Sequence, residues 1–147
     1  HTWIQADQPG VYRGQCAEFC GHQHAHMAFN VVAEPMDNFL AWIAHQRQPA
    51  PDPMTDEERR GRDVFMQSPC VSCHTIRGTD AGAHLGPELT HVGSRLTIAA
   101  GTLPNVRGHL AGWVANAQSI KPGSRMPPNL LESGDLQAVL TYLRSLR

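Results

Sequence analysis

The sequence has few aromatic and charged residues and contains no long hydrophobic run. Aromatic residues make up 6% and charged residues 17% of the 147 residues, and the formal net charge is −1. A charge so near zero gives no indication of nucleic-acid binding. No apolar run approaches the ~20 residues that a membrane helix needs, and no signal-peptide pattern opens the chain. We therefore expect no membrane-spanning helix within these residues.

Cysteine is also scarce, and its 4 copies lie in two close pairs, Cys16/Cys20 and Cys70/Cys73. The 13 glycines and 11 prolines predict many turns and loops. Such a chain is expected to depend on cofactors as well as on a hydrophobic core. The sequence starts at His1 and enters patterned sequence at once, from which we expect a further portion upstream.

The second cysteine pair belongs to the motif Cys70-Val71-Ser72-Cys73-His74. Two thiols at this spacing can be added across the two vinyl groups of a haem, and His74 then becomes an axial ligand of the iron. A thioredoxin-like dithiol or half of a zinc site are the alternatives. The adjacent histidine and the lack of another cysteine pair nearby favour covalent haem.

The first cysteine pair lies in a loop, Cys16–Met27, that contains two thiols, three imidazoles and a thioether. These ligand types suit copper in electron-transfer sites, and two thiolates can bridge a pair of metal ions. The alternatives are a disulfide, a zinc site that uses His22 or His26, and histidines that face solvent. A disulfide would leave His24 and Met27 unexplained.

The segment Gly10–Gly21, followed by His24 and Met27, closely resembles the copper loop of cytochrome c oxidase subunit II. The resemblance covers residues 7–46 and implies a dinuclear copper A centre on a cupredoxin barrel. It implies that the copper ligands are Cys16, the Glu18 carbonyl, Cys20, His24 and Met27. One further histidine ligand is then expected upstream of this chain, and we do not assign His1 to that role. His22 and His26 match no ligand position and are expected at the surface.

Alternating residues predict strands at 2–4, 11–15 and 28–34, with a turn between the first two. Helical spacing predicts a helix over 36–45, whose apolar stripe should cover the barrel. Residues 48–53 hold three prolines and predict a semi-rigid linker. We therefore expect a cupredoxin fragment over 1–47, the linker over 48–53, and a second domain over 54–147.

The second domain is predicted to be helical. Thr55 and Glu58 form a capping-box pattern, which predicts a helix that runs to about residue 67. Gly61 within it predicts close crossing by another helix, for which residues 135–146 are the candidate. A further helix is expected over 106–117. Thr55–Arg147 resembles the class I cytochromes c, so the expected fold is mixed, a partial β fragment followed by an all-α cytochrome c domain.

The cytochrome c resemblance also implies partners for His74. Pro87, in Leu85-Gly86-Pro87, would accept the imidazole Nδ1 proton on its carbonyl and fix the ring. The distal ligand is expected to be Met126, because a proline-rich loop can hold its thioether rigidly at the iron. His84, His91 and His109 leave a bis-histidine site as the alternative.

The order of copper loop, linker and cytochrome domain resembles oxidases whose subunit II carries a fused cytochrome. This implies an electron-transfer subunit of a haem-copper terminal oxidase. Haem c would accept electrons from a cytochrome c or a quinol-oxidising complex and pass them to copper A, which serves the oxygen-reducing subunit I. The chain itself would only transfer electrons.

Upstream helices would anchor the subunit at the outer face of the bacterial inner membrane, with this soluble domain in the periplasm. One alternative function is a stand-alone periplasmic c-type cytochrome and copper carrier. The other is the copper A subunit of a nitrous or nitric oxide reductase.

Overall fold

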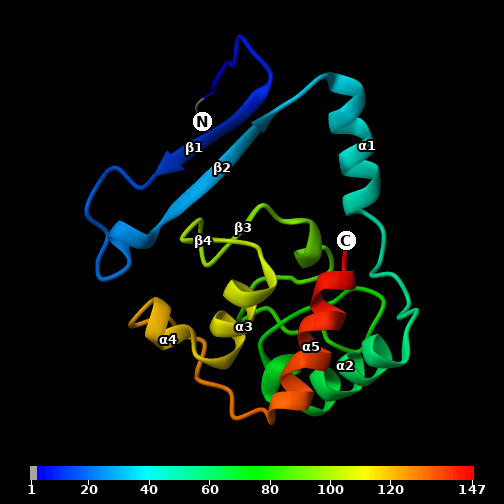
Figure 1. The fold of residues 1–147 in the computed structure, drawn as a ribbon. Helices are drawn as coiled ribbons and strands as arrows, with labels where there is room; N and C mark the ends of the chain where they lie inside the picture. Colours follow the sequence, from blue (N-terminus) through cyan, green and yellow to red (C-terminus); the bar gives the residue numbers. More distant parts are fainter. Residues whose placement is uncertain (1–2) are drawn as a thin grey trace.

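The computed structural model describes residues 3–147 and begins with a β-hairpin (Figure 1). Strands β1 (Gly10–Gln15) and β2 (Ala28–Ala33) pair antiparallel, from Gly10 opposite Ala33 to Gln15 opposite Ala28. A short 3-10 helix (His24–His26) lies in the loop that joins them. Helix α1 (Met36–Gln46) follows. These bounds confirm the predicted strands at 11–15 and 28–34 and the helix after Pro35.

The strand predicted at residues 2–4 is wrong for the residues described. Thr2 lies outside the described residues, and Trp3 and Ile4 belong to no strand and are 82% and 75% exposed. A strand needs a hydrogen-bonding neighbour, and nothing in residues 3–147 pairs with this segment. The sheet that contains β1 and β2 therefore has only these two strands among the described residues.

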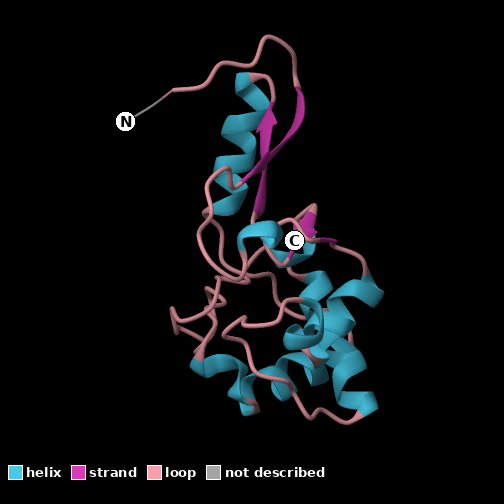
Figure 2. Cartoon of the chain, turned by 90° about the vertical axis from the view of Figure 1, so that its left-hand side faces the viewer, coloured by secondary structure: helices cyan, strands magenta, loops and turns pink. Residues whose placement is uncertain are grey.

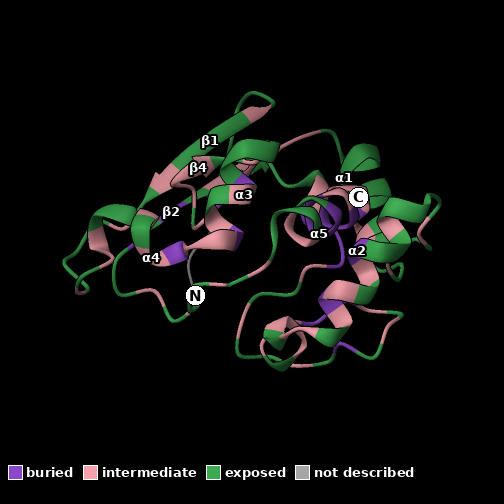
Figure 3. Cartoon of the chain, turned by 60° about the horizontal axis from the view of Figure 1, so that its bottom comes forward, coloured by how far each residue is buried: buried purple, intermediate pink, exposed green. Residues whose placement is uncertain are grey.

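The predicted packing of α1 is not formed among the described residues. In the predicted stripe, Met36, Phe39 and Leu40 are exposed and Ile43 is half-buried. Phe39 and Trp42 stack on each other with ring centroids 6.1 Å apart. Figure 3 shows exposed residues over α1 and the hairpin, in contrast to the buried ones on α5. The stripe was predicted from helical spacing, which gives the apolar face but not what covers it.

The rest of the chain consists of helices joined by long loops (Figure 2). Its helices are α2 (Asp56–Gln67), α3 (Arg107–Ala115), α4 (Ala117–Ile120) and α5 (Ser133–Ser145). Contrary to the all-α expectation, a small antiparallel hairpin is present, β3 (Thr97–Ile98) with β4 (Leu103–Pro104). None of the helices in residues 3–147 has the length and apolarity to cross a membrane. The mixed fold class is confirmed, with this added hairpin.

The helix predicted over 106–117 is divided in two. Asn116 has φ −156° and ψ 89°, outside the helical region, and its side chain accepts hydrogen bonds from the backbone N–H groups of Gln118 and Ser119. Asparagine competes for backbone hydrogen bonds in this way and favours helix caps. Helix α3 therefore ends at Ala115 and α4 begins at Ala117.

The crossing of α2 and α5 forms the centre of the core. The predicted capping box is present, since Thr55 Oγ1 accepts the Glu58 N–H at 3.1 Å and Glu58 Oε2 accepts the Thr55 N–H at 3.0 Å. At Gly61 an added Cβ would lie 2.0 Å from the carbonyl oxygen of Ala138. Close crossing at Gly61 is thus confirmed. Buried residues around the crossing include Phe65, Val139, Leu140, Tyr142 and Leu143.

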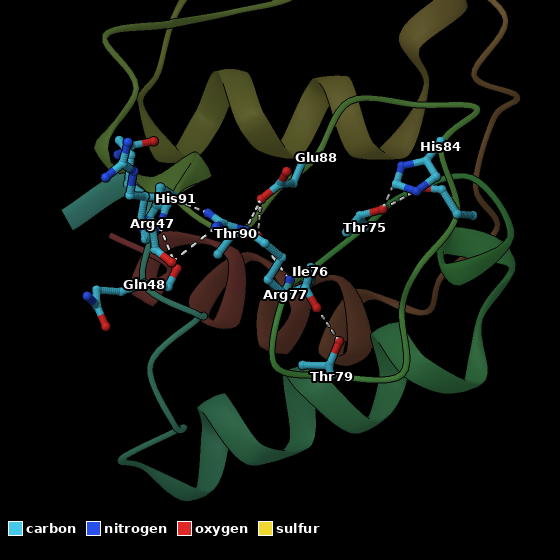
Figure 4. Close-up of polar contacts among 12 residues, drawn as sticks. Arg47, Gln48, Thr75, Ile76, Arg77, Thr79, His84, Glu88, Thr90 and His91 are labelled. Carbon is cyan, nitrogen blue, oxygen red and sulfur yellow. Dashed lines mark hydrogen bonds and ion pairs between the residues drawn. The ribbon is translucent and has the colours of Figure 1, made fainter. Parts of the chain in front are cut away.

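Residues 77–91 anchor the segment after α1 (Figure 4). The guanidinium group of Arg77 donates to the carbonyls of Gln46 and Arg47, at the end of α1. Its Nε donates to Glu88 Oε1 at 2.6 Å, and the same oxygen accepts the Thr90 hydroxyl at 2.7 Å. The carboxylate therefore orients the arginine toward the carbonyls that end a helix, where positive charge is favoured.

His91 contacts the same segment from a buried position. Its Nε2 lies 3.2 Å from the carbonyl oxygen of Gln48, and its Nδ1 lies 3.1 Å from that of Arg147. Ala50 N–H also donates to the Arg77 carbonyl at 2.9 Å. The proline-rich segment is thus hydrogen-bonded to the part of the chain that follows it, at Gln48 and at Ala50.

Acidification is expected to weaken the contact between Glu88 and Arg77, which orients Arg77 toward the end of α1. The Thr90 hydroxyl, and after it Arg77, hold the pKa of Glu88 below its ordinary value. A carboxylate whose pKa is lower in the folded chain stabilises that chain above its unfolded-state pKa, and the stabilisation is lost as pH falls through the folded value. In urea unfolding, the stability difference between the parent and Glu88→Gln, at most about 1 kcal/mol for an exposed pair, should shrink between about pH 7 and about pH 3. A difference that stays constant over this range would contradict the role of Glu88.

Candidate metal and haem centres

The loop between β1 and β2 is closed by hydrogen bonds at its base. The Cys16 N–H donates to the Met27 carbonyl at 3.0 Å, directly beyond the last strand pair. The side chain of Gln15 donates to the His24 carbonyl at 3.1 Å. Gly21 has φ +113°, a conformation that residues with a Cβ rarely adopt. The hairpin therefore brings both ends of the loop together and turns the cysteines toward His24.

Cys16, Cys20 and His24 form a cluster of potential metal ligands. Their ligand atoms all lie within 4.8 Å of one another. The two sulfur atoms are 3.5 Å apart, Cys20 Sγ is 3.8 Å from His24 Nδ1, and Cys16 Sγ is 3.3 Å from the Glu18 carbonyl oxygen. Two thiols, an imidazole and a carbonyl oxygen around one small volume fit a copper centre with bridging thiolates.

Other features of the loop distinguish the alternatives. Both cysteines are free, and 3.5 Å is much longer than the ~2.05 Å of a disulfide. His22 and His26 are exposed and lie outside the cluster.

The hydrogen bond with Cys16 raises the pKa of the Cys20 thiol. A metal that binds here must displace that proton. Met27 lies at the base of the loop and is 40% exposed.

The motif Cys70–His74, predicted to attach a haem, begins shortly after α2. Pro69–Ser72 forms a 3-10 turn, and the N–H groups of Cys73 and His74 both donate to the Cys70 carbonyl, at 3.2 and 3.0 Å. This turn places two half-buried thiols and the imidazole on one compact segment. Burial raises the pKa of the Cys70 thiol. Reactive dithiols instead have a thiol with a lowered pKa.

The His74 ring is held from one side by residues 85–87. Its Nδ1 lies 2.7 Å from the Pro87 carbonyl oxygen, so Nδ1–H donates and Nε2 remains available for a metal. The Gly86 N–H donates to the Cys73 carbonyl at 2.6 Å. A Cβ on Gly86 would lie 2.6 Å from His74 Cε1. The donor set and the space beside the ring thus fit a haem with His74 as proximal ligand.

The histidines considered for a bis-histidine site have other hydrogen-bond partners. Both ring nitrogens of His91 face backbone carbonyls. His109 Nδ1 lies 3.0 Å from the Pro104 carbonyl oxygen, and His84 Nδ1 lies 3.4 Å from Thr75 Oγ1. These contacts involve both ring nitrogens of His91 and the Nδ1 atoms of His84 and His109.

Met126 lies half-buried in the loop between α4 and α5, and Gln118 holds that loop together. The Gln118 side-chain amide donates to the Met126 carbonyl at 2.8 Å and to Ser124 Oγ at 3.0 Å. Its Oε1 accepts the Gly123 N–H at 3.1 Å. We did not predict this role from the sequence. The Asn116 cap, which starts the short helix bearing Gln118, is the signal that could have indicated it.

Gly86→Ala is expected to displace the His74 ring, because the new methyl group would overlap Cε1 and Nδ1. Mutation of groups that orient a metal-bound histidine typically costs about 10–100-fold in metal affinity or activity. We expect a shifted haem reduction potential and easier displacement of His74 by added imidazole. Gly82→Ala, where nothing lies within 4 Å of the added Cβ, is the control. Equal potentials in both variants would contradict the positioning role.

Comparisons with known proteins match both parts of the chain that carry the candidate centres. Residues 58–147 match the family model "Cytochrome c", and residues 1–34 match "Cytochrome C oxidase subunit II, periplasmic domain". The chain is 40% identical over 149 residues to a cytochrome c oxidase subunit 2 of Alkalihalophilus pseudofirmus, covering 100% of this chain and 42% of that protein. It is 30% identical over 143 residues to the subunit 2 of Bacillus subtilis, covering 93% and 40%. The chain thus spans about two fifths of the length of these relatives.

Proposed function

Because the chain belongs to the cytochrome c oxidase subunit II family and carries a cytochrome c domain over residues 58–147, we propose that it relays electrons within a haem-copper terminal oxidase. Electrons would pass from covalently bound haem c to a dinuclear copper A centre, and from there to the oxygen-reducing subunit. Both groups supply one-electron transfer without bond cleavage. The observation that carries this proposal is the presence of both ligand constellations on one chain.

In this proposal Cys70 and Cys73 hold haem c covalently, and His74 and Met126 are its axial ligands. The 2.7 Å contact from His74 Nδ1 to the Pro87 carbonyl supports the assignment of Nε2 to the iron. A thioether ligand raises the haem potential. With both axial positions filled by protein ligands, the haem has no vacant position for oxygen, so its role is electron transfer.

The copper centre would use Cys16, Cys20, His24, Met27 and the Glu18 carbonyl. The 3.5 Å separation of the two sulfur atoms supports the binding of both thiolates to the same pair of copper ions. A further histidine is expected from the part of the subunit that precedes this chain, which is also expected to anchor it at the periplasmic face of the inner membrane. We divide the chain into a copper-binding part over 1–47, a linker over 48–53 and a haem-binding part over 54–147.

The partners in this proposal are oxidase subunit I and an electron donor, a cytochrome c or a quinol-oxidising complex. The test is to tag the full-length subunit and purify it from membranes. We expect co-purification with a large haem-copper subunit and oxygen consumption that is lost in Cys16→Ser. Isolation without such a subunit, or unchanged oxygen consumption in Cys16→Ser, would contradict the proposal and favour a stand-alone carrier.

A further inference from the structure

Three segments that are far apart in the sequence meet at the tip of the β3–β4 hairpin (Figure 1). The Ala28 N–H, at the start of β2, donates to the Ala100 carbonyl at 2.9 Å. Thr102 Oγ1 lies 3.4 Å from the His26 carbonyl oxygen. The side chain of Gln23 donates to the Pro122 carbonyl. We call these three hydrogen bonds the tip contact, because residues 99–102 at the hairpin tip are at its centre.

Packing at the tip contact is closer than its hydrogen bonds alone require. Ala28 is 7% exposed, and it is the only buried residue between positions 3 and 60 of the described chain. A Cβ added to Gly101 would lie 2.8 Å from Ala28 Cβ and 3.1 Å from its carbonyl carbon. The hairpin tip therefore covers the one buried position of the copper-binding part, and only glycine fits opposite it.

The backbone of the tip is held in a conformation that L-residues rarely adopt. Ala99, Ala100 and Gly101 are consecutive and have φ values of 55°, 54° and 73°. Alanine in this left-handed region is strained, and such strain persists only where surrounding contacts fix it. The turn directs the Ala100 carbonyl at Ala28 and the Ala99 carbonyl at Lys121.

Lys121 connects the tip to the loop that carries Met126. It is 8% exposed, and its Nζ donates to the Ala99 carbonyl at 3.2 Å. Burial lowers the pKa of its amine. Pro122, next in sequence, accepts the hydrogen bond from Gln23. The loop that carries Met126 is thus hydrogen-bonded both to the hairpin tip and directly to the loop between β1 and β2.

We propose that the tip contact is the interface between the two redox centres. It joins the loop that supplies His24 and Met27 to the loop that supplies Met126, and so fixes the separation across which one electron passes, with no atom transferred and no bond broken. Gly101, Ala28 and Gln23 are its positioning residues. This inference rests on the proposed function for the identity of the centres, but the contact itself involves only residues of this chain.

The test uses Gly101→Val and Gln23→Ala in the full-length subunit. Valine would push the tip away from Ala28, whereas Gln23→Ala removes one hydrogen bond without altering the hairpin backbone. Gly108→Val is the matched control, because nothing lies within 4 Å of its added Cβ. The first readout is amide hydrogen exchange at Ala28, which needs no redox activity. We expect about tenfold faster exchange in Gly101→Val, the effect of losing one net hydrogen bond, and no change in the control.

The second readout is the rate of electron transfer from haem to copper in the loaded subunit, with the spectra of both centres unchanged. We expect slower transfer in Gly101→Val and Gln23→Ala than in the parent and the control. Electron transfer at the parent rate in both variants would contradict the proposed interface. An Ala28 amide that is not protected from hydrogen exchange in the parent would also contradict it. If the parent itself transfers no electron to copper, the proposed function fails, whatever the exchange data show.

Discussion

Replacing both Cys70 and Cys73 by serine is expected to remove all covalently bound haem from the chain. Cys70 lies in the 3-10 turn Pro69–Ser72 and packs against the hydrophobic core, and Cys73 directly follows the turn. A single substitution leaves one thiol for attachment, so only the double variant removes both thioether bonds. Because a cofactor that binds only the folded chain contributes its binding free energy to folding, we also expect a large fall in stability.

The measurement is haem staining of the denatured subunit together with its intact mass. The parent should retain haem after acid extraction, and the Cys70→Ser/Cys73→Ser variant should retain none. Cys16→Ser is the control, since its thiol belongs to the other ligand cluster, and it should keep its haem. Haem that survives extraction in the double variant would contradict covalent attachment at these cysteines.

Gly61→Val is expected to cause the largest loss of stability of any single substitution in the helical core. An added Cβ would lie 2.0 Å from the Ala138 carbonyl oxygen, 2.6 Å from its carbonyl carbon and 2.8 Å from Tyr142 Cβ. Backbone atoms cannot move aside as a flexible side chain can, so α2 and α5 must separate. Overpacking a core typically costs about 1–3 kcal/mol, and we expect the upper end of this range or more.

Urea unfolding of the haem-loaded subunit measures this cost. Gly108→Ala is the control, because Gly108 is also helical but has nothing within 4 Å of its added Cβ. That substitution should not destabilise the chain, since alanine is the better helix former and the added methyl group meets no other atom. If Gly61→Val unfolds at the same urea concentration as the parent, the close crossing of α2 and α5 does not support the fold.

Gly61 also illustrates what the sequence could predict. A glycine inside a well-capped helix has a known cost, so a close helix crossing was a reasonable expectation, and the structure confirms it. The Pro87 contact with His74 could likewise be expected from a local motif in a resembling family. The strand at Trp3 and Ile4 was wrong because alternation indicates a face but not a neighbouring strand. Whether a neighbouring strand is present depends on the fold and cannot be read from the segment itself.

Contacts between distant segments were not predictable in the same way. Nothing in the sequence Ala99-Ala100-Gly101 distinguishes three left-handed residues from an ordinary small-residue turn, because the strain is imposed by contacts with Ala28 and Lys121. These contacts follow no helical or strand periodicity. The hydrogen bonds of Arg77 could not be predicted either, because their acceptors at the end of α1 lie about thirty residues earlier. The sequence thus predicts the two centres, and the structure shows how the segments that carry their predicted ligands are joined.

The most direct test of the relay is to reduce the haem rapidly in the full-length subunit and follow both centres by their absorption. We predict that the haem is reoxidised as copper is reduced, with one rate constant that does not depend on protein concentration. In Cys16→Ser, without copper, the haem should stay reduced. Haem reoxidation at the parent rate in Cys16→Ser would contradict electron transfer from haem to copper.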